Sequence, residues 1–483
     1  MPRTHAAQHV YEGSPGAAAR PLPDGYRPRR PQATAFYRVI ADHLETMLQD
    51  ARDRSAHGFG LPHHVERSFR RLLDCGIVER GFCRVACKAC HYEVLVPFSC
   101  KVRALCPSCD GRRMAGGAAR LVDHTLPREA DYRQWTLSFP RWLRIRLLRD
   151  PALTSEILGS FVRAVFAYHR RRARARGISA SEGGSVTSTQ FGGSFVNSNL
   201  HFHTVIAEGV WYEDRGGEVR FHALPPPTDE DVEQLAAVIV RRITRRLARR
   251  DADARCDDEP DVLDHARAEA VQLPVPRTEP REHQISSRHR CAFLDGFSLH
   301  ANTSVGAADR AALERLCRYI LRPVISAQRL SVRPDGRVEY RFPRPDPTGR
   351  TSWVTDGPTW CRRLATLMPP RRGHTTRYHG VLASAHRWRA DVLPVPPPEV
   401  TSNTTTPTPM TLARRLDWAA LLRRTWGPEI TTCPRCGESL AVLAFITHPE
   451  ATAKILAHLD LTSDVPVIAP ARAPPAGELD FDF

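Results

Sequence analysis

The stretch Asn199-Leu200-His201-Phe202-His203-Thr204-Val205-Ile206 decides the fold of the middle of this chain. Polar and apolar residues alternate through its first half, which is typical of a β-strand whose side chains point to opposite faces in turn. His201 and His203 therefore share one face, and Phe202 faces the core. Two neutral imidazoles on one face form half of an open metal site, with positions left for a third ligand, water and a substrate phosphate. Paired strand histidines are also common as hydrogen-bonded surface or core residues, so spacing alone leaves both interpretations open.

Two further strands are expected beside this one. The segment 184–190 reads as a strand joined to 199–211 by a connection rich in Gly, Ser and Asn, and 134–139 reads as another strand, ended by Pro140. On the preceding strand, Gln190 is the nearest polar side chain that suits a third metal ligand. Its neutral oxygen favours Mg²⁺ or Mn²⁺ over Zn²⁺, although a solvated strand glutamine fits the pattern equally well.

Helices are predicted where apolar residues recur at helical spacing. These segments are 36–48, 65–73, 155–174, 229–250 and 307–321, and the last is stopped by Pro323. The charged, proline-containing segment 251–281 reads as an inserted loop. Helices and strands mixed in this order indicate an α+β fold.

The helix predicted at 307–321 ends in Glu314-Arg315-Leu316-Cys317-Arg318-Tyr319-Ile320-Leu321-Arg322-Pro323. Arg315 and Arg322 lie four residues before and three residues after Tyr319, so the three side chains are expected to share one face. The two guanidiniums would bind DNA phosphates bidentately beside the phenol, which is a nucleophile for a phosphodiester. An amphipathic tyrosine that packs at a helix end is the simpler interpretation of the same spacing.

Cysteines form the next recognisable pattern. Cys87 and Cys90, then Cys106 and Cys109, make two CxxC pairs with fifteen residues between them. Each pair presents two sulfurs in one tight turn, so the four thiolates are predicted to hold one structural Zn²⁺. Other candidates to replace a ligand or to serve a second ion are Cys75, Cys83 and Cys100. Basic residues around the pairs indicate a phosphate-contacting surface supported by the zinc site, with a zinc site for folding alone as the alternative.

A third CxxC pair, Cys433 and Cys436, follows much later and has Gly437 behind it. It has the shape of a zinc-binding turn but no obvious second pair. His448 and His458 are candidate ligands that would complete it. The pair is consistent with a metal site and with two unrelated thiols.

The composition gives the chain a strong positive charge. Lys and Arg outnumber Asp and Glu by 69 to 53 in 483 residues, a formal net charge of +16, which suits a polyanionic partner. The longest apolar runs, such as 205–210, fall far short of the roughly 20 residues that cross a bilayer. Residues 1–30 lack the apolar region of a secretory signal. We therefore expect a cytoplasmic protein with no membrane segment, whose thirteen cysteines bind metal rather than form disulfides.

The order of these motifs closely resembles the rolling-circle insertion-sequence transposases of the IS91 family. The resemblance runs from about Cys75 to the C-terminal Cys-Pro-Arg-Cys. It includes Ser99-Cys100-Lys101, Cys106-Pro107-Ser108-Cys109, Gln134-Trp135-Thr136-Leu137-Ser138-Phe139-Pro140, Asn199-Leu200-His201-Phe202-His203 and Arg318-Tyr319-Ile320-Leu321-Arg322-Pro323.

The resemblance implies an HUH endonuclease (His, hydrophobic residue, His) on a small antiparallel sheet flanked by helices. A metal on His201 and His203 would polarise a scissile phosphate, and Tyr319 would attack it, giving a 5′-phosphotyrosine and a free 3′-hydroxyl without ATP. The partners would be single-stranded element ends, recognised by the zinc domain, and target DNA at the bacterial nucleoid. Two alternatives are a plasmid or phage HUH replication initiator and a non-catalytic zinc-containing DNA-binding regulator.

One departure from the family concerns the nucleophile. The founding members carry two tyrosines four residues apart on this helix, whereas Arg315 and Pro323 stand four residues before and after Tyr319 here. The sequence therefore resembles the single-tyrosine branch associated with common-region elements, and Tyr378 is only a distant second candidate.

The chain is expected to comprise six parts. They are a disordered basic tail at 1–34, a helical and zinc-binding DNA-recognition domain at 35–125, an HUH nuclease domain at 126–395, a linker at 396–412, a small CxxC module at 413–465 and a tail at 466–483.

Overall fold

The strand that carries the histidine pair lies in the middle of an antiparallel sheet. The computed structural model describes residues 30–253, 261–271, 289–346, 348–371, 373–394 and 433–472. The largest sheet of this part has seven strands in the order β14-β4-β5-β3-β9-β8, with β10 also paired to β3. Every pair is antiparallel. The strands are β3 (Tyr132–Ser138), β4 (Gly184–Gly192), β5 (Ser198–Ala207), β8 (Cys291–Leu294), β9 (Phe297–His300), β10 (Ser304–Val305) and β14 (Thr376–Gly380).

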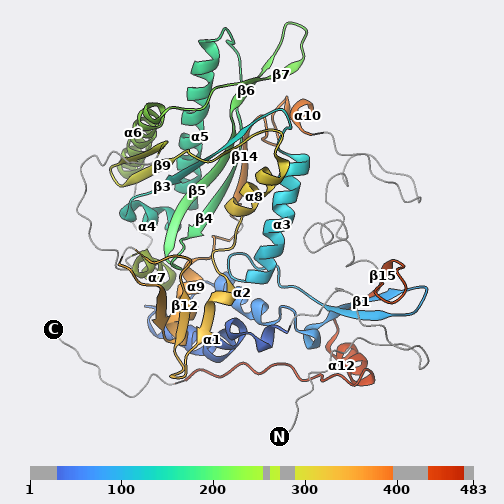
Figure 1. The fold of residues 1–483 in the computed structure, drawn as a ribbon. Coiled ribbons are helices and arrows are strands. Elements are labelled where there is room, and N and C mark those ends of the chain that lie inside the picture. The colour runs from blue at the N-terminus through green and yellow to red at the C-terminus, as the bar shows by residue number, and fades with distance from the viewer. Residues whose placement is uncertain are drawn as a thin grey trace, which may run out of the picture.

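Helices cover both faces of this sheet (Figure 1). Phe202 of β5 is fully buried on one face, in a cluster formed mainly by side chains of three helices, and burial of a side chain of this size stabilises the fold by about 1.5–3 kcal/mol. Val205 points to the opposite face, where two helices pack. The first set is α4 (Arg141–Arg149), α5 (Pro151–Arg174) and α6 (Asp229–Asp253), and the second is α3 (Pro107–His124) and α8 (Arg310–Ile320). The predicted α+β fold is confirmed, and alternation along β5 leaves His201 and His203 on the α8 side.

A second core joins the N-terminal helices to a segment from much later in the chain. Side chains between residues 325 and 368 pack into one buried cluster with those of residues 36–109. Trp360 is fully buried there, and its ring stacks on that of Tyr340 with centroids 5.3 Å apart. Residues 325–368, which lie within the nuclease domain expected at 126–395, therefore pack into the N-terminal core. The elements are α1 (Ala35–Asp53), α2 (His63–Leu73), α9 (Gly357–Thr366) and a sheet of β11 (Leu330–Val332), β12 (Val338–Arg341) and β13 (Ser352–Thr355).

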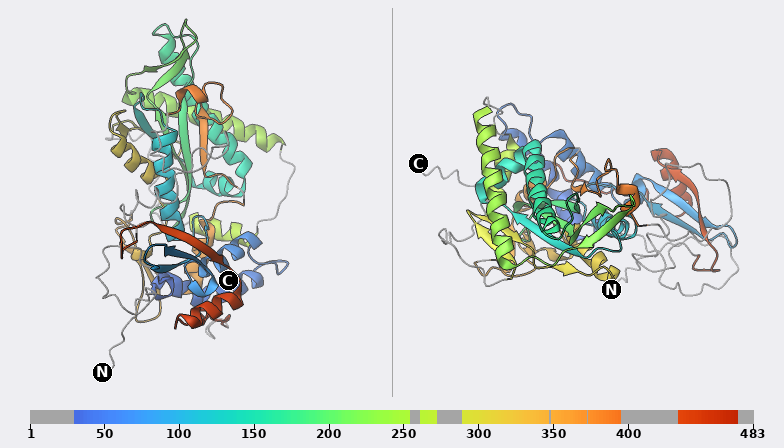
Figure 2. Two further views of the ribbon diagram at one scale, coloured as in Figure 1. Left: turned by 90° about the vertical axis from the view of Figure 1, so that its right-hand side faces the viewer. Right: turned by 90° about the horizontal axis from the view of Figure 1, so that it is seen from above.

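The C-terminal segment also returns to the N-terminal part. β15 (Leu440–Ile446) pairs with β1 (Phe82–Cys87), which pairs with β2 (Glu93–Pro97), and both pairs are antiparallel. This three-stranded sheet projects from one side of the molecule (Figures 1 and 2). Within the module expected at 413–465, β15 therefore completes the sheet begun by β1 and β2. The strand is followed by α12 (Pro449–His458).

Parts of the predicted tails and the linker fall outside the described residues. They are 1–29, 395–432 and 473–483, so the linker expected at 396–412 lies among them. The tail expected to begin at 466 instead runs along α1, where the backbone N–H of Ala469 donates to the carbonyl of Ala41 at 3.0 Å. At the other end, Pro31–Ala33 forms a short 3-10 helix before α1.

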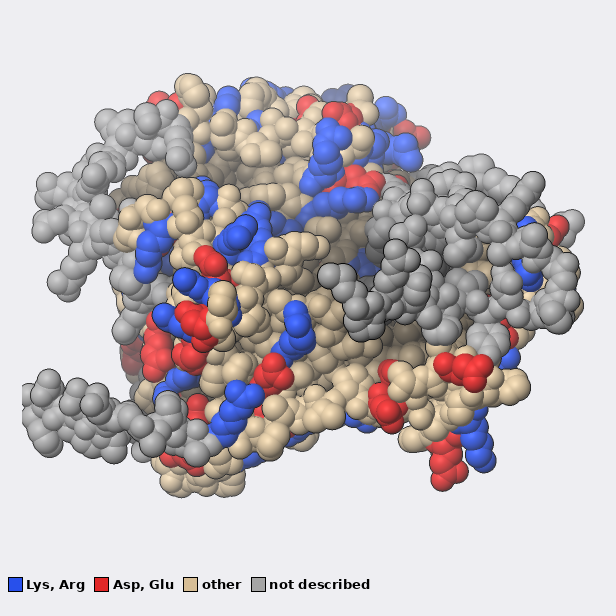
Figure 3. All heavy atoms as spheres, turned by 60° about the horizontal axis from the view of Figure 1, so that its bottom comes forward, with Lys and Arg blue, Asp and Glu red and all other residues tan. Residues whose placement is uncertain are grey.

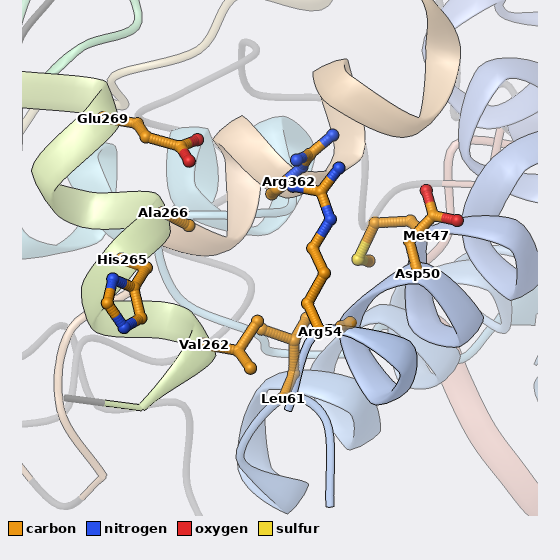
Figure 4. A pocket seen from close by; sticks show the side chains of 10 residues that line it. Met47, Asp50, Arg54, Leu61, Val262, His265, Ala266, Glu269 and Arg362 are labelled. Atoms are coloured by element: carbon orange, nitrogen blue, oxygen red, sulfur yellow. The ribbon is translucent and has the colours of Figure 1, made fainter. Parts of the chain in front are cut away.

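The remaining elements include one helix in a region predicted as a loop. α7 (Val262–Val271) lies within the segment 251–281, and its buried Leu263, Ala266 and Ala270 recur at helical spacing. A cavity of about 240 Å³ separates α7 from α1 and α9, and Figure 4 shows its lining side chains. The other elements are β6 (Gly209–Glu213), β7 (Val219–Ala223), α10 (Arg389–Val392) and the 3-10 helices Val78–Arg80 and Ala327–Arg329. Among the described helices, none combines the length and the apolar character needed to cross a bilayer.

Candidate active site and zinc centre

β5 brings the two predicted histidines together at the wall of a cleft. The Nε2 atoms of His201 and His203 lie 3.0 Å apart. Two neighbouring ligands of an octahedral ion at about 2.1 Å are themselves about 3.0 Å apart, so the pair can share one divalent cation. The His201 ring is held from behind, because its Nδ1 donates to the carbonyl of Asn199 at 2.7 Å. That bond leaves the Nε2 lone pair of His201 directed into the cleft.

Both histidines are kept neutral by their surroundings. The pKa of His201 is lowered to about 4, mainly by burial; the bond to Asn199 opposes this shift, and Arg144 and Arg322 add to it. Burial also lowers the pKa of His203 well below its ordinary value, and His201 and Arg322 add to the effect. Neutral imidazole is the form that coordinates a metal, so the pair suits a cation rather than an anion.

Two polar side chains of β3 lie behind His203, and the sequence did not single them out. The amide nitrogen of Gln134 is 2.8 Å from Nδ1 of His203, and the hydroxyl of Thr136 is 3.2 Å from the same atom. Strand register explains the contact, since Thr136 lies directly opposite His203. The sequence did contain a signal for these two residues: polar residues at 134, 136 and 138 alternate with the buried Trp135 and Leu137, so the polar side chains share one face of the strand.

α8 places Tyr319 beside the histidines. The buried side of this helix is formed by Leu313, Leu316, Cys317 and Ile320, whereas the Tyr319 side chain is 43% exposed. Its ring meets the ring of His203 edge to face, with centroids 5.5 Å apart. Both residues and His201 line one cleft of about 760 Å³. The Tyr319 side chain therefore lies at the cleft and outside the buried side of α8.

The two arginines predicted beside the tyrosine differ in position. The guanidinium carbon of Arg322 lies 4.5 Å from the centre of the Tyr319 ring, and Arg322 lines the cleft. Arg315 is exposed and is not part of that lining. α8 ends at Ile320, so Arg322 reaches the ring from the chain beyond the helix rather than from a shared helical face.

Gln190 lies beside the histidines in register but has a partner of its own. It is directly opposite His201 on β4, and its amide nitrogen donates to the carbonyl of Ile320 at 2.9 Å. Carbonyls in the last turn of a helix have no partner within the helix, so this bond anchors the end of α8 to the sheet. Gln190 lines a neighbouring cavity with Arg322 and Tyr378 rather than the histidine cleft. Because the amide nitrogen of Gln190 is used in this bond, its side-chain oxygen is the atom left for the predicted role of third metal ligand.

The far wall of the cleft adds residues that the sequence analysis gave no role. His300 of β9 lies opposite Thr136, and the Sγ atom of Cys291 on β8 is 2.7 Å from Nδ1 of His300. A row of polar side chains therefore crosses the sheet from His203 to Cys291. No pattern in the sequence joins these strands, because β8 and β9 follow β3 by more than 150 residues.

The four cysteines predicted as one zinc site are divided between two clusters. One consists of Cys75, Cys100, Cys106 and Cys109, and the other of Cys87, Cys90, Cys433 and Cys436. The prediction of a single four-cysteine site is therefore corrected, because Cys87 and Cys90 lie at the turn between β1 and β2 and belong to the other cluster. In the first cluster the sulfur of Cys109 lies 3.6 Å from that of Cys75 and 3.5 Å from that of Cys100. A zinc–thiolate tetrahedron has edges of about 3.8 Å, so these distances suit one zinc ion.

The first cluster lies at the start of α3, which leads toward Tyr319. All four cysteines of this cluster are buried, and their sulfurs lie within 4.8 Å of one another, as in a closed structural metal site. Further along α3, a Cβ atom at Gly117 would come within 2.9 Å of the Leu321 side chain at the end of α8. The Leu321 side chain, just beyond α8, therefore lies close against α3 at this point. Three arginines on or near α3 line the cavity next to Gln190: Arg103, Arg113 and Arg120.

Two protein-family models match the chain. One, described as "Putative transposase", matches residues 184–389. The other, described as the transposase zinc-binding domain of the IS91 type, matches residues 41–139. These matches support an IS91-type transposase. The comparison with curated proteins and the comparison with solved structures each gave no match.

The matched regions of the chain contain both parts of the candidate site. The zinc-binding match holds the whole first cluster, from Cys75 to Cys109, which supports structural Zn²⁺ there. The other match holds the histidine pair and Tyr319. A match to a transposase family points to DNA as the partner. In Figure 3, basic and acidic side chains are mixed over one face, and basic side chains lie along the rim of a hollow in it. Cys433 and Cys436 lie outside both matches.

Proposed function

We propose that this transposase cuts one strand of DNA with the hydroxyl of Tyr319, assisted by Mg²⁺ or Mn²⁺ on His201 and His203. The observation that carries the proposal is the contact between the Tyr319 and His203 rings within one cleft. The two converging Nε2 atoms, both on neutral rings, suit the metal. When bound, the ion supplies Lewis-acid polarisation of a phosphate oxygen.

The chemistry at Tyr319 is a direct exchange of one ester for another. Its oxygen forms a bond to phosphorus while the bond from phosphorus to the 3′ oxygen breaks. The phenol loses its proton to solvent, and the leaving 3′ oxygen gains one. The products are a 5′-phosphotyrosine and a 3′-hydroxyl. Because the phosphodiester energy stays in the covalent link, a 3′-hydroxyl of target DNA can reverse the reaction and release Tyr319 without ATP.

Arg322 is the residue we assign to the scissile phosphate. Its guanidinium lies over the Tyr319 ring and lines both the histidine cleft and the neighbouring cavity. A planar guanidinium can bind two phosphate oxygens at once, which holds phosphorus in line with the phenol. We assign Arg315, which is exposed and lies outside the cleft, to a phosphate of the DNA strand next to the scissile one.

The single strand is proposed to continue from the cleft toward α3. The neighbouring cavity shares Arg322 with the cleft and adds Arg103, Arg113 and Arg120, which belong to the zinc-binding part of the chain. Most protein contacts to DNA phosphates come from such cationic side chains. The zinc cluster would thus fix the helix that binds the element end next to the helix that cuts it.

The test is formation of a covalent protein–DNA adduct. Purified transposase is mixed with a single-stranded oligonucleotide from the element end and Mn²⁺, and the adduct is resolved on a denaturing gel. Tyr319→Phe should abolish the adduct, whereas Tyr378→Phe, a tyrosine of the neighbouring cavity, should retain it. Adduct at the native level in Tyr319→Phe would reject the assignment. A DNA-binding regulator would shift the oligonucleotide without any adduct, and His201→Ala would then be silent.

A further inference from the structure

The turn at Cys87 and Cys90 has a defined backbone geometry. The N–H of Cys87 donates to the carbonyl of Tyr92 at 2.8 Å, and the N–H of His91 donates to the carbonyl of Cys87 at 3.0 Å. His91, directly after the second cysteine, has a positive φ of 58°. Few residues other than glycine adopt this conformation, so the turn is specified by more than its two cysteines.

The turn at Cys433 and Cys436 repeats this geometry position by position. The N–H of Cys433 donates to the carbonyl of Glu438, five residues on, at 2.6 Å. The N–H of Gly437 donates to the carbonyl of Cys433 at 2.9 Å, and Gly437 has a φ of 82°. Two segments that lie more than 300 residues apart thus form the same turn, and each presents two sulfurs.

The two turns face each other. The sulfur of Cys87 lies 3.4 Å from that of Cys436, and the sulfur of Cys90 lies 3.4 Å from that of Cys433. All four sulfurs are within 4.8 Å of one another, and all four cysteines are free thiols. Four thiolates about 2.3 Å from one ion, near the corners of a tetrahedron, are the ligand set that Zn²⁺ prefers.

Apart from its backbone pairing with β1 and the stacking of the Phe445 ring on Phe98, β15 has few buried contacts near these four cysteines. The local core is small: it consists of three of the cysteines (Cys87, Cys90 and Cys433) with Tyr92, Val94 and Leu440, and Cys436 is exposed. On β15, Val442 is 55% exposed and Phe445 is 69% exposed within the described part of the chain. Small units with so little buried apolar surface commonly depend on a metal for their stability. Each turn also carries a basic residue, Lys88 or Arg435, which offsets the net negative charge of four thiolates around a divalent ion.

We propose that Cys87, Cys90, Cys433 and Cys436 bind a second zinc ion, which fastens β15 to the β1–β2 hairpin. The transposase then carries two structural zinc ions, one at the start of α3 and one that joins the N-terminal hairpin to the C-terminal segment. This proposal does not depend on the cleavage reaction proposed for Tyr319.

The experiment counts zinc in the purified full chain by mass spectrometry of the metal. The native protein should hold two zinc ions per chain, and Cys433→Ser should hold one. The matched control is Cys83→Ser, which removes a β1 cysteine that belongs to neither cluster and should leave two. One zinc in the native protein, or two in Cys433→Ser, would overturn the proposal, as would iron in place of zinc.

Two further measurements separate loss of the ion from general misfolding. Cys436→His keeps a zinc ligand and should retain two zinc ions, whereas Cys436→Ser should retain one; equal zinc in the two variants would count against the site. Amide hydrogen exchange of Cys433→Ser should rise in Leu440–Ile446 and stay unchanged in Ser198–Ala207. Unchanged exchange in Leu440–Ile446 would show that β15 does not need the ion.

Discussion

Replacing Gln134 by methionine is expected to weaken metal binding at the proposed site on His201 and His203. The Gln134 amide lies 2.8 Å from Nδ1 of His203, and both side chains are buried. When Nε2 of His203 binds a metal, Nδ1 carries the proton. The Gln134 amide must then turn its oxygen toward the ring to accept a hydrogen bond from that N–H. Methionine fills the same space but is a poor acceptor, so the ring loses the partner that orients it.

The size of the effect follows from the two partners of that nitrogen. Loss of the hydrogen-bond partner of a ligating histidine typically costs about 10-fold to 100-fold in metal affinity, or about 1.4–2.7 kcal/mol. The Thr136 hydroxyl, 3.2 Å from the same Nδ1, remains to accept the proton in Gln134→Met. We therefore expect about a tenfold rise in Kd for the single variant and close to 100-fold when Thr136→Val is added.

The assay is calorimetric titration of the purified protein with Mn²⁺. Gln234→Met is the matched control, since that glutamine lies on α6 and its amide bonds only the exposed Glu230 side chain among the contacts described. Its Kd should equal that of the native protein. An unchanged Kd in the double variant, with binding lost in His201→Ala, would refute the argument that β3 orients His203.

Two other changes test the residues around Tyr319. Arg322→Gln should lower the slope of log affinity against log salt for a single-stranded oligonucleotide by about 0.7, the value of one phosphate contact, as measured by fluorescence anisotropy; Arg315→Gln should change it less, and the reverse order would exchange their roles. Gln190→Met should slow adduct formation more than it weakens Mn²⁺ binding, because it frees the end of α8 from the sheet. A selective loss of Mn²⁺ affinity would instead identify Gln190 as a metal ligand.

The sequence predicted the central strand and its helices because their signals are local. Alternation around Phe202 identifies β5 and puts His201 and His203 on one face, whatever the rest of the chain does. The apolar side of α8 likewise follows from Leu313, Leu316 and Ile320. The contact between Tyr319 and His203 is not local, and it came within reach only through the resemblance of the whole motif order to a known family.

The sequence could not show which cysteines share an ion. Spacing identifies a CxxC turn but not its partner, and the partner of Cys87 and Cys90 lies more than 300 residues away at Cys433 and Cys436. Cys75 and Cys100 belong to no CxxC pair, so only the fold shows that they complete the first cluster. The same limit applies to Gln134, a single strand glutamine whose role depends on the register between β3 and β5.

The second cysteine cluster also sets an order of events during synthesis. Cys433 emerges 343 residues after Cys90, which at 5–20 residues per second is an interval of roughly 20–70 s. Throughout that time the nascent chain exposes Cys87 and Cys90 as an open pair of thiols, while the strands of the histidine sheet are already being made. Oxidants or zinc shortage should therefore damage newly made chains far more than finished ones, in which all four sulfurs face one another.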